Sequence, residues 1–220
     1  MKQKNIKKID SKSQLAILLS KIGDFPKAKI DIEQYPTDSE IAAEVLWNMV
    51  LIDPPEGKVR VDLGSGTGIL GIGLLLLGTK KVYFIDQDLE ALNTAKKHLS
   101  IVKSEGFPIG KAIFKQQDIK NLKPETFKKV DLVIQNPPFG TKVRHIDTVF
   151  LEKAFKIAPI VYSFHKSETR NFIEKFAEKN DFKVSHRWDF NFPLKARFAF
   201  HRRKIHRIKV SCFRFEKIYK

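Results

Sequence analysis

Residues 59–68 read VRVDLGSGTG, and this stretch decides the fold. The run from Val59 to Leu63 predicts a buried strand, because short apolar runs fill the middle of parallel sheets. The three alternate glycines that follow allow a tight turn and a close approach of the backbone to a ligand. A helix is expected over Ile69 to Leu77, and Gly78 ends it. The stretch is therefore interpreted as a strand–turn–helix unit of an α/β sheet.

The same alternation of strand and helix continues along the chain. It predicts one α/β domain over residues 1–220, a doubly wound, mainly parallel sheet with helices on both faces. Residues 1–12 are expected to form a basic tail and residues 13–52 an N-terminal helical extension. Two long alternating segments, Phe182 to Phe192 and Ile205 to Ile218, predict a closing antiparallel hairpin. The other expected elements are strands over Lys81 to Ile85, Ala112 to Gln116, Val130 to Ile134 and Ile160 to Phe164, and helices over Ser13 to Ile22, Ser39 to Leu51, Leu89 to Lys103, Thr148 to Ile157 and Ser167 to Lys179.

The charge of the chain is strongly positive. Its 41 Lys and Arg residues face 25 Asp and Glu, which leaves a net charge of +16. The segment from Phe182 to Lys220 holds twelve Lys or Arg and only two acids, Asp189 and Glu216. Because the excess is concentrated there, it favours a polyanionic partner over a generic lysine-rich surface.

Cysteine content and hydropathy bear on the compartment. The single cysteine, Cys212, excludes an internal disulfide and a cysteine-only metal cage, which fits a reducing, cytoplasmic compartment. No cluster of His and Cys suggests a metal site. The longest apolar run, Ile69 to Leu77, is too short to span a bilayer. The basic N-terminus lacks the long apolar region of a secretory signal, so neither a membrane span nor secretion is expected.

Acidic or amide side chains follow four successive candidate strands. Asp62 precedes the glycines, where a carboxylate would repel a pyrophosphate but can pair with a cationic amino acid group. Asp86 ends the next strand and is placed to accept ribose hydroxyls, and Asp118 can accept from an adenine amino group. Asn136 follows the fourth strand. One such residue is more often solvated or a helix cap, but four at equivalent places favour a ligand site at the carboxyl edge of the sheet.

The turn Asn136-Pro137-Pro138-Phe139-Gly140 has specific chemistry. The Asn136 amide oxygen can accept a hydrogen bond from an exocyclic amine. The prolines fix φ and remove backbone donors, so the carbonyl of Pro137 is free to accept as well. Phe139 offers a face for stacking, worth about 1–3 kcal/mol per base. The turn suits a planar group that bears an amine, although an ordinary proline turn with a core Phe is the simpler alternative.

These features resemble the class I S-adenosylmethionine methyltransferases that act on amino groups. Further segments narrow the resemblance to the family of archaeal and eukaryotic enzymes that methylate adenine N6 in small-subunit ribosomal RNA. It implies a Rossmann-like, seven-stranded sheet, S-adenosylmethionine as cofactor, and a small zinc-ribbon activator protein that adds a strand beside the sheet. The segments that carry the narrower resemblance are EQYPT at 33–37, NPPFGTK at 136–142, VYSFHKS at 161–167 and FHRRK at 200–204.

The resemblance also implies roles for individual residues. The substrate amine would meet Asn136, Pro137 and Phe139 as the catalytic residues, and Asn136 would also border the cofactor. The N-terminal extension would cover the cofactor. The residues that would bind the cofactor are Gln34, Tyr35, Thr37, Asp62, Gly64, Gly66, Gly68, Asp86, Asp118 and Asn136.

Two groups of basic residues are candidates for RNA binding. One group is expected just beyond the sheet edge, and the other lies in the connection from Pro193 to Arg207, interleaved with Phe198 and Phe200. Basic groups between aromatic ones suit single-stranded or loop RNA. The alternatives are ordinary exposed loop charge and a basic hairpin tip whose Phe residues belong to the core. The candidates are Lys142, Arg144, His165, Lys166, Lys195, Arg197, His201, Arg202, Arg203 and Lys204.

Three other functions remain open from the sequence. Asn-Pro-Pro turns also occur in methyltransferases of DNA adenine and of protein glutamine. The glutamine enzymes usually carry Tyr where this chain has Phe139, and DNA enzymes usually carry a separate recognition region, for which 220 residues leave little room. A non-enzymatic RNA-binding scaffold with a vestigial fold is the third alternative, against which the intact Asp62, Asp86, Asp118 and Asn136 argue.

Overall fold

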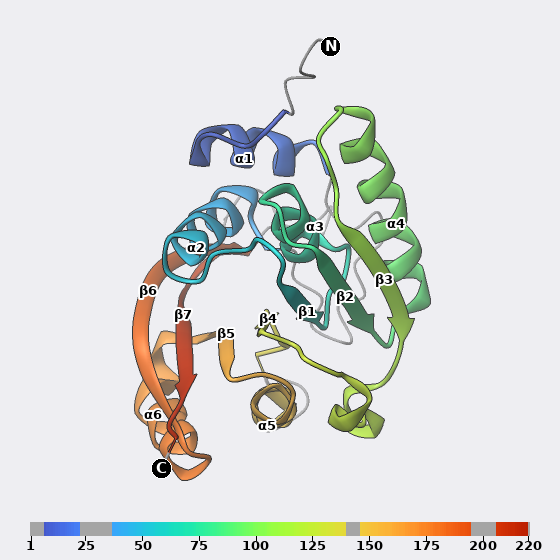
Figure 1. The fold of residues 1–220 in the computed structure, drawn as a ribbon. Helices are drawn as coiled ribbons and strands as arrows, with labels where there is room; N and C mark the ends of the chain where they lie inside the picture. Colours follow the sequence, from blue (N-terminus) through green and yellow to red (C-terminus); the bar gives the residue numbers. More distant parts are fainter. Residues whose placement is uncertain (1–6, 23–36, 140–145, 195–205, 220) are drawn as a thin grey trace.

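A seven-stranded sheet forms the centre of the molecule, with the strand order β3-β2-β1-β4-β5-β7-β6 (Figure 1). This computed structural model describes residues 7–22, 37–139, 146–194 and 206–219. The first five strands run parallel and β7 pairs antiparallel with both β5 and β6. The strands are β1 (Val59–Leu63), β2 (Lys81–Asp86), β3 (Lys111–Gln116), β4 (Leu132–Gln135), β5 (Ile160–Lys166), β6 (Phe182–Leu194) and β7 (His206–Lys217).

Helices cover both faces of the sheet, as the sequence predicts. Figure 1 shows α1, α2 and α3 on one side of the sheet and α5 and α6 on the other. One apolar cluster joins the sheet to α1–α4, and a second joins it to α5 and α6. The helices are α1 (Lys12–Ser20), α2 (Ser39–Ile52), α3 (Ile69–Leu76), α4 (Leu89–Ser104), α5 (Ile146–Ile157) and α6 (Arg170–Lys179).

Side-chain caps fix where the helices α2 and α4 begin. Asp38 accepts backbone hydrogen bonds from Glu40 and Ile41 at the start of α2. Asp88 does the same for Glu90 and Ala91 at the start of α4. Such caps satisfy donors that the first helical turn leaves unpaired, so the starts of both helices are set locally.

The expected elements are present among the described residues, and the differences lie at their ends. The helix expected from Thr148 begins at Ile146, and the strand expected from Val130 begins at Leu132. Between β3 and β4 the described chain forms only two short 3-10 turns, η2 (Ile119–Asn121) and η3 (Pro124–Thr126). Another short turn, η4 (Ser167–Thr169), precedes α6.

A bulge in β6 changes which face its even-numbered residues occupy. The register shifts between Val184 and His186. Before the shift Phe182 packs in the layer of α5 and α6, whereas Phe190 and Phe192 pack in the layer of α2. The extra residue therefore lets one alternating strand contribute to both cores.

A buried ion pair fixes the far end of α2. The carboxylate of Asp53, which follows the helix, accepts from Arg214 Nε and Nη2 at 2.8 Å each and from the Tyr162 hydroxyl at 2.8 Å. Burial raises the pKa of Asp53, but the bonds from Arg214 and Tyr162 outweigh it, and the pKa lies below its usual value. The helix is thus bound to both β5 and β7.

Candidate active site

The carboxyl ends of the parallel strands bring the predicted site residues to one edge of the sheet. Asp62 pairs in register with Phe84 of β2 and Ile134 of β4, and Asp86 with Gln116 of β3. The glycine loop, Asp86, Asp118 and Asn136 therefore leave the sheet at its carboxyl edge. This is where open α/β sheets bind ligands.

The glycine loop, residues 64–68, is held by packing and by hydrogen bonds within the protein. Gly64, Gly66 and Gly68 all have left-handed φ angles, of 72°, 52° and 85°. A Cβ on Gly64 would lie 2.8 Å from the Phe150 ring, and one on Gly68 would lie 2.9 Å from Ala95. The loop therefore requires glycine even without a ligand, because both the backbone and the neighbouring side chains exclude a larger residue.

His98 supports the same loop from α4. Its Nδ1 lies 3.0 Å from the carbonyl oxygen of Thr67, and the ring is buried. Burial lowers the pKa of His98 and so favours the neutral ring. In that form the Nδ1–H donates to the Thr67 carbonyl. His98 was not predictable from the sequence, because a lone histidine in an amphipathic helix gives no signal of its contact.

Asp86 connects the end of β2 to the glycine loop. Its Oδ2 accepts from the Gly66 amide at 2.8 Å and its Oδ1 from the Asp88 amide at 2.9 Å. Burial raises the pKa of Asp86, and the two amide donors oppose this shift. The position fits the predicted ribose contact, which stays a prediction.

Asp62 is almost completely buried, at 1% exposure, behind the same loop. Its Oδ2 accepts from the Gly71 amide at 2.7 Å in the first turn of α3. Burial raises its pKa to about 7, partly opposed by the Gly71 amide, and the nearby Asp86 charge adds to the rise. The bond to α3 is a structural role in its own right, and the predicted pairing with a cationic amino group stays a prediction.

Asp118 also has a structural role. Its Oδ1 accepts from the Lys120 amide at 2.9 Å and caps η2. The side chain is half-buried, so it remains open to the predicted contact with adenine, which stays a prediction.

The side chain of Asn136 is held on one side only. Its Nδ2 donates to Thr37 Oγ1 at 2.9 Å, just before α2. Its Oδ1 is buried and has no hydrogen-bond partner in the part of the chain that the structure describes. A buried acceptor without a partner costs about 1–3 kcal/mol, so this oxygen is poised to accept from a ligand amine.

The rest of the proline turn packs beside Asn136. Pro137 is buried and Phe139 half-buried. The Phe139 ring meets Phe192 of β6 edge to face, with centroids 6.4 Å apart and an interplanar angle of 87°. Phe139 is thus oriented by a core residue while part of its surface stays exposed.

The prediction that His165 contacts RNA is wrong. The ring is 1% exposed, with Nε2 2.7 Å from Ser163 Oγ. His165 lies within β5, where alternate residues face the same side of the sheet. It is four positions after the buried Val161 and therefore points, like Val161, into the layer of α5. Lys166, at the end of the strand, is partly exposed and lies 3.8 Å from Glu168.

Several predicted site residues lie outside the described residues. The structure therefore leaves their predicted roles where the sequence put them. They are Gln34, Tyr35, Lys142, Arg144, Lys195, Arg197, His201, Arg202, Arg203 and Lys204.

Comparison with known proteins identifies the family of the chain. The methyltransferase small domain model matches residues 17–159, which include the glycine loop and the proline turn. The crystal structure of PH1948 from Pyrococcus horikoshii has a TM-score of 0.82 at 40% identity and covers 94% of this chain and 98% of its own. The architecture is that of a class I methyltransferase, with the predicted seven-stranded, mainly parallel sheet.

Two curated relatives make the assignment more specific. The rRNA N(6)-adenosine-methyltransferase METTL5 of Danio rerio is 35% identical over 92% of this chain and 97% of its own length. Mettl5 of Drosophila melanogaster is 34% identical over 90% and 92% respectively. The chain belongs to the methyltransferase small domain family and, within it, to the METTL5 family, which confirms the resemblance found in the sequence.

Proposed function

We propose that this chain is an S-adenosylmethionine-dependent methyltransferase that methylates adenine N6 in RNA, most specifically in small-subunit ribosomal RNA. Family membership supports the reaction class, and the curated relatives are rRNA N6-adenosine methyltransferases. The observation that carries the acceptor chemistry is the buried Oδ1 of Asn136, which lacks a partner among the described residues. An adenine amine supplies the missing donor.

The residues present fit S-adenosylmethionine. Gly64, Gly66 and Gly68 would lie along the methionine part, Asp86 would hold the ribose and Asp118 the adenine. Gln34, Tyr35 and Thr37 would cover the cofactor from the N-terminal side. The backbone of the loop is already fixed by Ile85, whose carbonyl accepts from the Gly64 and Ser65 amides at 2.8 and 2.9 Å. Little reorganisation is then needed on binding.

The acceptor half of the site works by orientation and electrostatics. The bound cofactor supplies an electrophilic methyl group on a sulfonium. Asn136 Oδ1 and the Pro137 carbonyl would each accept a hydrogen bond from one of the two N6–H groups. These two hydrogen bonds would direct the nitrogen lone pair away from the ring system and toward that methyl. The same acceptors stabilise the positive charge that grows on N6 as the N–C bond forms and the S–C bond breaks. The surplus proton then leaves N6 for water, so no strong base is needed.

Phe139 would hold the adenine after it leaves its stack, since N6 transfer requires an extruded base. The basic connection from Pro193 to Arg207 would bind the surrounding RNA, together with Lys142, Arg144 and Lys166. Phe192, which contacts Phe139, directly precedes this connection in the sequence.

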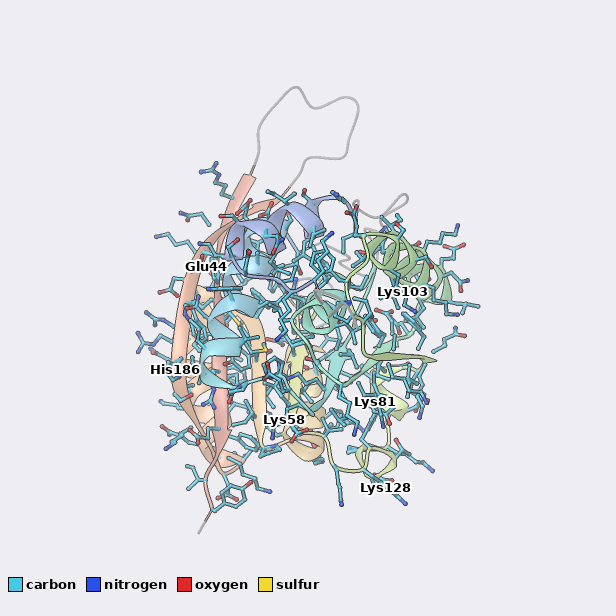
Figure 2. The ribbon with its side chains drawn as sticks, turned by 45° about the horizontal axis from the view of Figure 1, so that its top comes forward. Glu44, Lys58, Lys81, Lys103, Lys128 and His186 are labelled. Carbon is cyan, nitrogen blue, oxygen red and sulfur yellow. The ribbon has the colours of Figure 1, made fainter. Side chains whose placement is uncertain are left out.

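A small zinc-ribbon activator is also part of the proposal, and β3 is the edge that suits it. All six β3 residues pair with β2 without a register shift, whereas the other edge, β6, carries a bulge, which discourages strand addition. Figure 2 shows Lys81, Lys103 and Lys128 on the β3 and α4 side of the molecule, so the partner should present acidic residues. The amides of Lys111 and Gln117 donate toward β2, so Ala112 should direct its amide outward. Ala112→Pro should abolish stimulation by a purified activator and leave the basal activity intact.

A cytoplasmic location is proposed from the single reduced cysteine. Among the described residues no helix is long and apolar enough to cross a bilayer.

The test of the function is methylation of total RNA with labelled cofactor, followed by nucleoside analysis and mapping. N6-methyladenosine in small-subunit rRNA is the expected product. DNA and protein are offered as substrates in parallel reactions, and label in either instead of RNA would support the DNA or glutamine alternatives. No cofactor binding by calorimetry would support the vestigial scaffold.

A further inference from the structure

Four buried or half-buried polar side chains form a network on the side of the sheet away from Thr37. In order, they are Gln135, Ser163, His165 and Asp147. Gln135 Nε2 donates to Ser163 Oγ at 2.9 Å, and Ser163 Oγ lies 2.7 Å from His165 Nε2. His165 Nδ1 has no hydrogen-bond partner among the described residues, and the Asp147 carboxylate faces it at 3.7 Å, an electrostatic contact beyond hydrogen-bond distance. Gln135 and Ser163 are fully buried and are register partners on β4 and β5.

The two end residues of this network, Gln135 and Asp147, lie before and after the proline turn in the sequence. Gln135 directly precedes Asn136, and Asp147 is the second residue of α5. The segment between them contains Asn136 to Phe139. One buried histidine thus connects the strand that enters the turn to the helix that follows it.

With the amide nitrogen of Gln135 facing Ser163, as in this structure, the donors and acceptors allow one proton arrangement. The Gln135 amide nitrogen can only donate, so Ser163 accepts from it and gives its own proton to His165 Nε2. The imidazole proton is then on Nδ1, facing Asp147. The reverse arrangement would place the bare Nδ1 lone pair against a carboxylate, which is repulsive. Burial raises the pKa of Asp147, but His165 outweighs this effect and the pKa stays below its usual value, so the group is a carboxylate.

We propose that Gln135, Ser163, His165 and Asp147 are positioning residues that join the strand entering the catalytic turn to the start of α5 and so hold Asn136 in its reactive orientation. The Asn136 side chain is held by Thr37 from the α2 side. The network holds its backbone from the α5 side. This inference rests on the proposed function, since it assigns the network to the chemical step.

The first test separates positioning from stability. Ser163→Ala should lower kcat about tenfold or more, because small misplacements of reacting groups are costly, and should leave the cofactor Kd unchanged. Ser211→Ala is the matched control: this buried hydroxyl on β7 also has two side-chain hydrogen bonds, to Asp189 and Ser167, but none to the turn. Asp147→Ala should lower kcat as Ser163→Ala does, while Asp147→Asn, which keeps an acceptor for Nδ1–H, should restore it. A kcat for Ser163→Ala within twofold of wild type, or an equal loss in Ser211→Ala, would overturn the proposal.

The second test does not depend on the substrate. Hydrogen exchange of the amides of Phe139 and of the first turns of α5, residues 146–151, should be faster in Ser163→Ala than in wild type and unchanged in Ser211→Ala. Nitrogen NMR of the wild-type protein should show His165 protonated on Nδ1. Unchanged exchange in Ser163→Ala, or protonation on Nε2, would overturn the network even if the RNA activity proves correct. If the wild type fails to methylate RNA while these two signals are present, only the proposed function is at fault.

Discussion

The cofactor half of the site and its acceptor half are built differently. In the cofactor half, residues 62–88, Asp62, Asp86 and the Thr67 carbonyl each have a partner within the protein. In the acceptor half, residues 136–139, the Oδ1 of Asn136 has none among the described residues. The two carboxylates of the first half thus have protein partners before a ligand binds, although the buried Ser65 hydroxyl of the glycine loop has none among the described residues. In the second half the amide oxygen aimed at the reaction is itself left for the substrate.

The sharpest way to break this comparison is Asn136→Ala. Methyl transfer should fall at least about 100-fold, because one hydrogen-bonding group aimed at developing charge is worth that much. Cofactor affinity should fall much less, by about tenfold at most, because Asn136 only borders the cofactor and the glycine loop and Asp86 do not depend on this side chain. Labelled transfer and calorimetry measure the two quantities. Comparable losses in both would show that the halves are not independent.

Asp86→Ala should have the reciprocal effect. Hydrogen bonds to a charged group contribute about 1.5–3 kcal/mol, so cofactor affinity should fall about 10- to 100-fold. At saturating cofactor the kcat should change much less than it does in Asn136→Ala. Calorimetric titration of the cofactor checks the first expectation, and an unchanged affinity would remove Asp86 from the site.

A smaller effect separates the backbone requirement of the loop from its packing. Gly57 and Gly68 both have left-handed φ angles, of 74° and 85°, but a Cβ on Gly57 meets nothing within 4 Å. Gly57→Ala should cost about 1 kcal/mol of unfolding free energy, from backbone strain alone. Gly68→Ala should cost about 1–3 kcal/mol more, because its Cβ would overlap Ala95. Urea unfolding of both variants measures the difference, and equal losses would show that packing does not constrain the loop.

The smallest effect concerns pH and the buried Asp62, whose pKa is about 7. The raised pKa means that the folded state holds its proton more tightly than the unfolded chain, so this group lowers stability as the pH rises toward 7. If the cofactor's amino group pairs with the carboxylate, binding must release that proton below pH 7. Cofactor affinity should then rise severalfold between pH 6 and 7 and level off above pH 7. Linkage limits the rise to about tenfold per pH unit.

Calorimetry in buffers of different ionisation enthalpy detects this proton release. Asp62→Asn should abolish both the release and the pH dependence. Binding of wild-type protein without proton release would mean that Asp62 serves only α3, through the Gly71 amide.

Most of the fold was predictable because its signals are local. The apolar run of Val59 to Leu63, the glycines after it and the caps at Asp38 and Asp88 each act over a few residues. The bulge near Ser185 was not predictable, because it serves two cores that come together only in the folded sheet.

His165 shows most clearly where sequence reasoning failed. Its place beside Lys166 in a basic protein predicts an RNA contact. In the structure the alternation of side chains along β5 directs His165 toward α5, inside the protein.

The sequence by itself determined the α/β alternation, the residues at the four strand ends and the proline turn, because these depend on local periodicity and residue chemistry. Only the tertiary structure decided which atoms remain without partners. Pairing depends on contacts such as Asn136 with Thr37, 99 positions apart, and Gln135 with Ser163, 28 apart. Local sequence carries no record of such contacts, since they exist only when the sheet is assembled.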